Sequence, residues 1–398
     1  MRRLAILASA LAIVVLLKGV VAARPHKARK ARASNKTAVA SVKGPAASCT
    51  ARDPHVAVPG SPHGMYVWNP YKVQGGKYEK QLESTVIGKD PTLCGVSLVV
   101  SWSSAEPSKG SLDWSSIQTQ AAPYLRAHLR YNLLFADASE VGTSDSATPA
   151  WVFNQDHVAR VQCPKQVPYP NFLDSKFEND WASFIAAAVK KFGSDSSVGY
   201  MRFGIGAGVE AYPGHMESKP PRPCYNAWVK TAQWTYAKWV KHSLNVVGML
   251  ARQQSNKQLM VAMNYIEDSP TVYAYANSVS AAAAPRGIAF GTENLGIGHV
   301  AAPGAKPGPC NPQAKKVNLY WCQAFKRHAG KVPFEFQPIA ATTPGSTQGY
   351  QLDISKLLQY AIANKAQILE LYPQEWLARD AEHKSALRAA AQVLGVAH

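Results

Sequence analysis

The chain has 398 residues, of which 46% are hydrophobic and 17% charged, and its formal net charge at pH 7 is +18. This composition excludes a wholly disordered protein, because it supplies ample apolar surface for a core. Ten Lys and Arg residues fall in residues 1–43, which contain no Asp or Glu, so the remainder carries only +8. A basic tail without interleaved aromatic side chains does not indicate a nucleic-acid-binding groove.

The amino-terminal residues have the layout of an export signal. Arg2 and Arg3 precede an apolar run over 4–17, and small residues follow at 21–23. We predict a signal peptide over 1–23, and hence a secreted, periplasmic or cell-envelope protein with no membrane span after cleavage. The alternative is an uncleaved membrane anchor, although the run is shorter than the ~20 residues that span a bilayer.

Residues 24–47 are basic, rich in small side chains and free of aromatic residues. Such a segment cannot bury enough apolar surface to offset its ordering entropy, so we predict a disordered linker. Its charge makes an anionic envelope polymer a candidate partner. Residues 48–398 then form one domain, a size that barrels of alternating strands and helices reach.

Short apolar runs alternate with helix-compatible stretches along this domain. The eight predicted strands are Met65–Trp68, Val96–Trp102, Tyr131–Ala136, Val198–Ile205, Leu259–Tyr265, Gly287–Thr292, Val332–Gln337 and Ile368–Tyr372. Helices are predicted near 112–129, 172–192, 225–254, 270–283, 313–328 and 354–363, and after Glu375. Eight repeats of this kind close a (β/α)8 barrel, an α/β fold. The rival is an open doubly wound sheet, but 204–208 lacks the GxGxxG spacing of its phosphate-binding loop.

The six cysteines indicate disulfide bonds. An even cysteine count in an exported chain favours disulfides. Cys310 and Cys322 are near enough to close one loop, and the pairing of the other four stays open.

The aromatic content of the long loop over 137–170 predicts an ordered wall. CxxC, HExxH and metal-spaced Cys/His clusters are missing from the sequence, so no cofactor or metal is predicted.

Two glutamates occupy positions where a barrel presents reactive groups. Glu335 lies in an apolar predicted strand, on the face opposite to Phe334 and Phe336. A carboxylate there is costly to bury unless it is paired, and an unusual position of this kind also marks reactive sites. Glu210 follows the fourth strand, near the carboxyl-terminal mouth where barrel active sites lie. Two facing carboxylates are the apparatus of glycoside hydrolysis.

The segment 100–117 (VSWSSAEPSKGSLDWSSI) strengthens this reading. It is similar to the element "W, then E-P, then G, then D-W" that follows strand two in many clan A glycoside hydrolases. Together with the two glutamates, the chain resembles this clan from about Met65 to Trp376, through scattered motifs. The resemblance implies a (β/α)8 barrel in which Glu210 is the general acid/base and Glu335 the nucleophile of a retaining mechanism.

Sugar sites combine flat aromatic faces with polar groups, and such residues gather at the predicted strand ends. The candidate substrate-binding residues are Trp68, Asn69, Trp102, Tyr212, His215, Tyr265, Gln337, Glu370, Tyr372 and Trp376. Each large aromatic residue among them is also a candidate for the core. For Glu370 the structural alternative is an ion pair with Arg202.

The sequence thus predicts an exported glycoside hydrolase that acts on a poly- or oligosaccharide. An alternative is a barrel that binds carbohydrate or the cell envelope without catalysis. The basic linker favours it, as does Val209, which stands where many clan members have Asn before the acid/base. A third reading is a barrel hydrolase acting on a non-sugar bond, although the sequence has no GxSxG elbow for a serine nucleophile.

Overall fold

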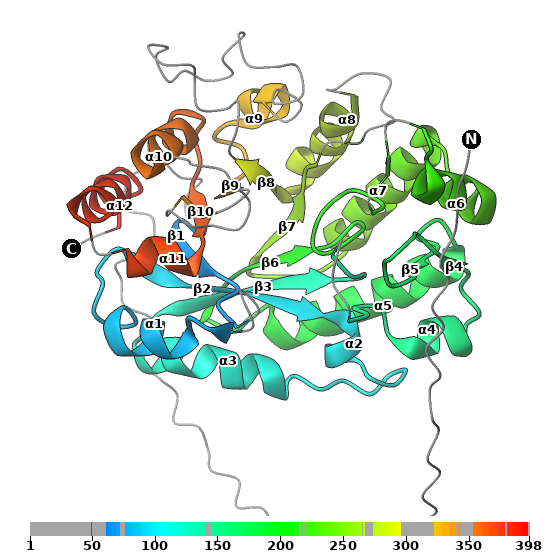
Figure 1. Cartoon of the computed structure of the whole chain (residues 1–398), viewed down its shortest axis with the longest axis horizontal. Coiled ribbons are helices and arrows are strands. Elements are labelled where there is room, and N and C mark those ends of the chain that lie inside the picture. The colour runs from blue at the N-terminus through cyan, green and yellow to red at the C-terminus, as the bar shows by residue number, and fades with distance from the viewer. Residues whose placement is uncertain are drawn as a thin grey trace, which may run out of the picture. The chain divides into compact units, whose positions relative to one another are not determined.

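Eight parallel strands close into a barrel (Figure 1). In chain order they are β1 (Gly64–Trp68), β2 (Leu93–Ser101), β3 (Arg130–Ala136), β6 (Val198–Phe203), β7 (Gln258–Ala262), β8 (Ala289–Leu295), β9 (Phe334–Pro338) and β10 (Ile368–Leu371). Around the barrel the order is β1-β10-β9-β8-β7-β6-β3-β2, with parallel neighbours throughout. The predicted (β/α)8 barrel is confirmed, and each predicted strand is present with small shifts at its ends.

The computed structural model describes residues 49, 61–71, 76–140, 145–214, 216–217, 220–264, 266, 274–295, 322–338, 341–342, 353–378 and 380–396. All of them belong to one compact unit, Gly44–His398. The predicted signal peptide and linker, the candidates His215 and Tyr265, and the proposed pairing of Cys310 with Cys322 lie outside the described residues. Within those ranges, no helix combines the length and apolar character that a membrane crossing requires.

Helices follow the strands and surround the barrel (Figure 1). They are α1 (Glu79–Thr85), α2 (Trp102–Ala105), α3 (Ser115–Arg126), α4 (Ala150–Asn154), α5 (Ser175–Phe192), α6 (Pro223–Ala232), α7 (Tyr236–Ala251), α8 (Ala274–Ala283), α9 (Cys322–His328), α10 (Ile354–Ala363), α11 (Pro373–Leu377) and α12 (Ala381–Val393). The single helix predicted over 225–254 is wrong, since α6 and α7 replace it. Gln233 adopts a left-handed conformation that ends α6. Thr235 then caps α7 by accepting a hydrogen bond from Lys238 N at 3.2 Å.

An aromatic layer joins the outside of the barrel to α5. Phe135 of β3 stacks on Phe203 of β6 with ring centres 5.0 Å apart, and meets Phe184 of α5 edge-on at 5.5 Å. Trp181, also on α5, stacks on Phe184 at 5.3 Å. All four side chains are buried. Burying aromatic rings of this size contributes a large share of the stability of a barrel, so this layer fixes the position of α5.

The described residues between β3 and α5, 137–140 and 145–174, form an ordered wall, as predicted. It contains α4 and the two-stranded antiparallel ribbon of β4 (Arg160–Val161) and β5 (Tyr169–Pro170). Trp151 of α4 is buried, and its Nε1 donates to the carbonyl of Glu106 at 3.1 Å. The wall is therefore held against the segment that follows β2.

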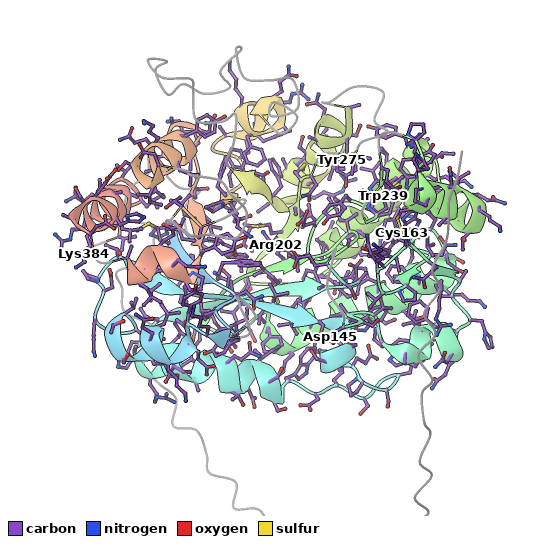
Figure 2. All side chains as sticks on the ribbon, viewed as in Figure 1. Asp145, Cys163, Arg202, Trp239, Tyr275 and Lys384 are labelled. Atoms are coloured by element: carbon purple, nitrogen blue, oxygen red, sulfur yellow. A yellow bond between two sulfur atoms is a disulfide. The ribbon has the colours of Figure 1, made fainter. Side chains whose placement is uncertain are left out.

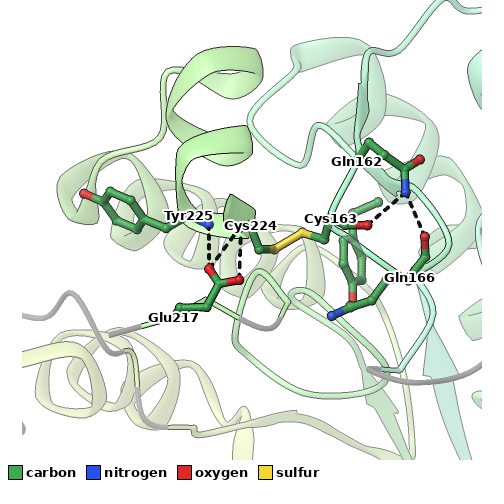
Figure 3. Close-up of a disulfide and its surroundings, with 7 residues drawn as sticks. Gln162, Cys163, Gln166, Glu217, Cys224 and Tyr225 are labelled. Atoms are coloured by element: carbon green, nitrogen blue, oxygen red, sulfur yellow. Dashed lines mark hydrogen bonds between the residues drawn. A yellow bond between two sulfur atoms is a disulfide. The ribbon is translucent and has the colours of Figure 1, made fainter. Parts of the chain in front are cut away.

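Two disulfides link parts of the chain that are distant in sequence. Cys163 in the wall pairs with Cys224 at the start of α6 (Figure 3). Beside this bond, the Glu217 carboxylate accepts hydrogen bonds from the backbone N–H groups of Cys224 and Tyr225. The second disulfide joins Cys49 to Cys94 of β2. Disulfides of this kind suit the oxidising compartment that the sequence predicts.

A buried acid links α11 and α12 to the residues after β9. The Glu375 carboxylate accepts hydrogen bonds from the backbone N–H of Thr342 and, at 2.6 Å, from its hydroxyl. His383 of α12 places its Nε2 3.4 Å from Glu375 and its Nδ1 2.8 Å from Asp380. Hydrogen bonds and charge from Glu375, and then from Asp380, raise the pKa of His383 to about 9.

Replacing His383 with Gln is expected to remove a pH-dependent part of the stability. Because the folded pKa of His383 lies above its unfolded value of about 6.5, its contribution is complete below pH 6.5 and disappears as the pH rises through about 9. Partial exposure of the ring limits the effect to about 1–3 °C in Tm. Thermal unfolding of both proteins at pH 6 and pH 10 checks this, and an equal difference at the two pH values contradicts it.

Candidate active site

Arg202 of β6 lies inside the barrel and meets two glutamates of neighbouring strands, Glu335 of β9 and Glu370 of β10. Its Nη1 is 2.9 Å from Glu335 Oε2 and 3.6 Å from Glu370 Oε2. A side chain of β6 that reaches β9 and β10 must cross the interior, and Figure 2 labels Arg202 among the strands. All three side chains have no exposed surface. The ion pair proposed for Glu370 is therefore present, and Glu335 shares it.

Neutral polar groups extend this network across the barrel. Tyr200 of β6 donates its hydroxyl to Glu370 Oε1 and lies 3.3 Å from Ser97 Oγ. Asn132 of β3 donates to Ser97 Oγ at 3.1 Å and accepts from the Tyr200 backbone N–H at 3.3 Å. Burial, and then the negative charges of Glu370 and Glu335, raise the pKa of Tyr200 well above 10. Its hydroxyl therefore stays protonated and remains a donor.

A glycine in β8 makes room for the Glu335 carboxylate. Gly291 is the register partner of Glu335, and a β-carbon at Gly291 would lie 1.9 Å from Glu335 Oε2. Phe334 and Phe336 point the other way and contact Phe325 of α9, with ring centres 4.7 and 5.2 Å apart. The predicted alternation along β9 is thus confirmed, and the carboxylate is fitted against bare backbone.

Gly291→Ala is expected to displace the Glu335 carboxylate from Arg202. We expect a loss of about 1–3 kcal/mol in stability from overpacking, and a decrease of about 10²-fold in any activity that uses Glu335. Gly248→Ala is the matched control, because its added β-carbon meets only Arg252 Nη1, at 3.5 Å, on the helix α7. Urea unfolding and rate measurements on both variants check the prediction, which fails if the two variants behave alike.

Glu210 lies in the loop after β6 and is held by an asparagine just beyond the next strand. Asn264, which follows β7, donates its Nδ2 to Glu210 Oε2 at 2.6 Å. Its Oδ1 accepts from the Ala211 N–H at 2.8 Å. Asn264 is buried and Glu210 is half-buried. One amide therefore fixes both the side chain and the backbone at the carboxyl-terminal end of the barrel.

Three buried donors from the surrounding helices fix the backbone of the same loop. Trp181 Nε1 donates to Gly204 O at 3.3 Å, His242 Nε2 to Ile205 O at 2.9 Å, and Trp239 Nε1 to Ala211 O at 3.0 Å. Figure 2 labels Trp239, which comes from α7. The loop that carries Glu210 is therefore a rigid element, which is the condition for placing a reactive group accurately.

Aromatic side chains and polar groups without a partner gather at the carboxyl-terminal ends of β1, β9 and β10. Trp68 and Tyr372 are half-buried, with ring centres 5.1 Å apart. Within the described part of the chain, Trp68 Nε1, Asn69 Oδ1, Gln337 Oε1 and Trp376 Nε1 are buried and have no hydrogen-bond partner. Buried polar groups are nearly always satisfied. Donors and acceptors left open beside flat rings are what a polyhydroxylated ligand would satisfy.

The structure places the predicted site residues in three groups. Glu335, Gln337 and Glu370 lie on interior-facing strand positions, and Glu210 and Tyr212 lie on the loop after β6. The third group lies at the carboxyl-terminal ends of β1 and β10 and comprises Trp68, Asn69, Tyr372 and Trp376. The expectation that Trp102 contacts substrate is wrong. The strand ends at Ser101, and the helical turn α2 carries Trp102 into the fully buried aromatic layer. There it contacts Trp151 and Trp181, with ring centres 5.4 and 5.2 Å apart.

Several residues of this region were not predicted from the sequence, among them Tyr200, Asn264, Gly291 and Asp137. A glycine inside an apolar strand run signals close approach, and this signal was available for Gly291. Asn264 falls inside the strand predicted over 259–265, where no sequence pattern marks it as a partner of Glu210. Asp137 follows β3 and is fully buried, and burial raises the pKa of its carboxyl well above the usual range. Its position after a strand was the only available sign.

Comparisons with solved structures show a likeness of fold. The catalytic domain of a β-amylase from Paenibacillus polymyxa matches with a TM-score of 0.56 and 12% identity, over 82% of this chain and 97% of that one. β-Galactosidases from Halorubrum lacusprofundi and Marinomonas ef1 match with TM-scores of 0.48 and 0.47 and identities of 14% and 11%, over 83% of this chain. The chain spans 57% and 59% of their lengths. No family model matches the sequence, and no curated protein does.

Proposed function

We propose that the chain is an exported glycoside hydrolase that cleaves O-glycosidic bonds in a poly- or oligosaccharide with retention. The observation that carries the proposal is a pair of carboxylates, each held by its own partner within one barrel. Arg202 holds Glu335 on β9 at 2.9 Å, and Asn264 holds Glu210 after β6 at 2.6 Å. These two positions match the strands on which the resemblance to clan A places the nucleophile and the acid/base.

The two partners suit the two roles chemically. The guanidinium of Arg202 stabilises negative charge on Glu335, the form that attacks an anomeric carbon. Glu210 has a neutral amide partner and is half-buried, as suits a group that gives and takes a proton. Attack by Glu335 breaks the bond to the leaving oxygen, which takes the proton of Glu210. Glu210 then removes a proton from water, which releases the sugar and restores Glu335.

The residues at the carboxyl-terminal ends of β1, β9 and β10 would form the sugar-binding surface. The half-buried rings of Trp68 and Tyr372 offer apolar faces, and the open polar atoms of Asn69, Gln337 and Trp376 offer hydrogen bonds to hydroxyl groups. Tyr212 lies on the same loop as Glu210 and belongs to this proposed surface. Retention requires the two reacting carboxyl groups to lie about 5–5.5 Å apart, whereas inversion requires about 6.5–9.5 Å.

Glu210→Gln tests the proposal directly. The wild type is expected to release new reducing ends from at least one member of a polysaccharide panel, and Glu210→Gln is expected to do so about 10²–10⁴-fold more slowly. Glu382→Gln makes the same change on the exposed face of α12 and is the matched control. Wild-type activity in Glu210→Gln would contradict the assignment of the acid/base.

A second candidate is a barrel that binds carbohydrate without cleaving it. It is favoured by the burial of Glu335, which has no exposed surface and is paired with Arg202. Catalysis therefore requires that substrate binding opens a path to this carboxylate. Binding of a polysaccharide in affinity electrophoresis, with no new reducing ends after prolonged incubation, would favour this candidate over the hydrolase.

A further inference from the structure

A cavity of about 410 Å³ lies at the amino-terminal end of the barrel. It is bordered by the first residues of three strands, Arg130 of β3, Val198 of β6 and Gln258 of β7. Glu210, by contrast, follows the carboxyl-terminal end of β6. The cavity is therefore at the opposite end from the proposed reaction, and the inference below does not depend on the proposed function.

The charged residues that line this cavity are all positive. They are Arg130, Lys257 and Arg286, and no Asp or Glu is among the described residues of the lining. Arg130 Nε is buried and has no hydrogen-bond partner in the described part of the chain. A buried donor normally has a partner, so the unmet Nε of this half-buried arginine indicates a missing acceptor.

One acid, Asp195, acts on the cavity from outside its lining. Asp195 acts on Lys257, but its carboxylate accepts from the Tyr131 hydroxyl at 2.9 Å and from the Ser197 N–H at 2.8 Å. Burial, and then the charge of Arg130, lower the pKa of Lys257. Burial and Arg130 likewise lower the pKa of His63, whose Nε2 is buried without a partner in the described ranges. The three cations of the lining are therefore offset only in part, by the single negative charge of Asp195.

We propose that this cavity binds an oxyanion of monosaccharide size, such as a sugar acid or a sugar phosphate. Arg130 supplies a buried donor, and Lys257 supplies a second positive charge from the turn before β7. The volume of the cavity falls in the range of small-molecule sites, which begins at about 300 Å³. It exceeds the space that a bare inorganic ion fills. The amide of Asn256, also in the lining, is a neutral group for sugar hydroxyls.

Calorimetric titration of the full chain tests the ligand class. The probes are galacturonate, glucose 6-phosphate, inorganic phosphate and neutral glucose. We expect one or both sugar oxyanions to bind, glucose not to bind, and the affinity to fall when salt rises from about 50 to about 500 mM. Binding of galacturonate alone identifies a carboxylate ligand, and binding of glucose 6-phosphate alone identifies a phosphate ester.

Three outcomes of the titration would overturn the proposal. They are equal binding of glucose, binding of inorganic phosphate as tight as that of the sugar oxyanions, and no binding of either sugar oxyanion at about 10 mM.

Substitutions locate the site. Arg130→Gln and Lys257→Gln are each expected to weaken binding at least about tenfold, which is about 1.4 kcal/mol. Lys384→Gln removes the same charge from the exposed face of α12 and is expected to leave binding unchanged. If circular dichroism shows that Arg130→Gln does not fold, Lys257→Gln alone is used for the test. Unchanged affinity in a folded Lys257→Gln protein, or equal weakening in Lys384→Gln, contradicts the assignment.

Discussion

Glu335→Gln is expected to lower kcat/KM for glycoside hydrolysis by at least about a thousandfold, because an amide cannot form the glycosyl-enzyme. The fold should survive the change. Arg202 keeps Glu370 at 3.6 Å as its partner, and Gln fits the space that Gly291 leaves. An activated 2-fluoro glycoside is expected to label the wild type covalently at Glu335, and peptide mapping by mass spectrometry measures the site of the label.

Glu370→Gln is the matched control for this experiment. It makes the same chemical change at the other carboxylate that Arg202 contacts, in an equally buried position. If the loss in Glu335→Gln arises from the chemistry of attack, Glu370→Gln should retain far more activity. Equal losses in the two variants would show that Glu335 acts through the integrity of the network, and labelling of a different carboxylate would exclude it as the nucleophile.

Arg202→Met is expected to destabilise the protein by about 3–5 kcal/mol. Methionine fills the same space but leaves Glu335 and Glu370 as two buried carboxylates without their shared cation. Repulsion between them adds to the cost of desolvation. Urea unfolding at pH 7 measures the loss, and Arg388→Met on the exposed face of α12 is the matched control.

A triple variant isolates the electrostatic part of this cost. When Glu335→Gln and Glu370→Gln accompany Arg202→Met, no charge remains in this part of the barrel, and much of the lost stability should return. A triple variant as unstable as Arg202→Met alone would mean that the guanidinium acts by packing. The comparison does not involve activity, so it stands whether or not the chain is a hydrolase.

The barrel could be predicted from the sequence because each strand is a short apolar run of its own. The charges inside it were also visible, since Glu335, Glu370 and Arg202 interrupt apolar runs in which charge is costly. The hydrogen-bond network around these charges could not be predicted from the sequence, because Ser97, Asn132 and Tyr200 are residue types that also occur on solvated strand faces. Which neutral side chains meet depends on the register between strands, and one sequence does not reveal that register.

The failures have local physical causes. The end of α6 depends on one residue, Gln233, in a left-handed conformation that no glycine or proline announces. Trp102 comes at a strand end, where one residue more or less of extended backbone decides whether a side chain faces the mouth or the helices. The sequence could place Glu210 near the mouth of the barrel. It could not identify Asn264 as the hydrogen-bond partner of Glu210, because Asn264 lies beyond the next strand.

The attachment of the Glu210 loop has a consequence for protein engineering. His242, one of its anchors, also places its Nδ1 2.8 Å from Glu178 of α5, and Asn245 donates to that same carboxylate at 2.9 Å. The outer helices are thereby mechanically coupled to the position of a reactive side chain. Directed evolution for altered turnover should therefore recover substitutions at Glu178 and Asn245, neither of which is among the residues of the proposed sugar-binding surface.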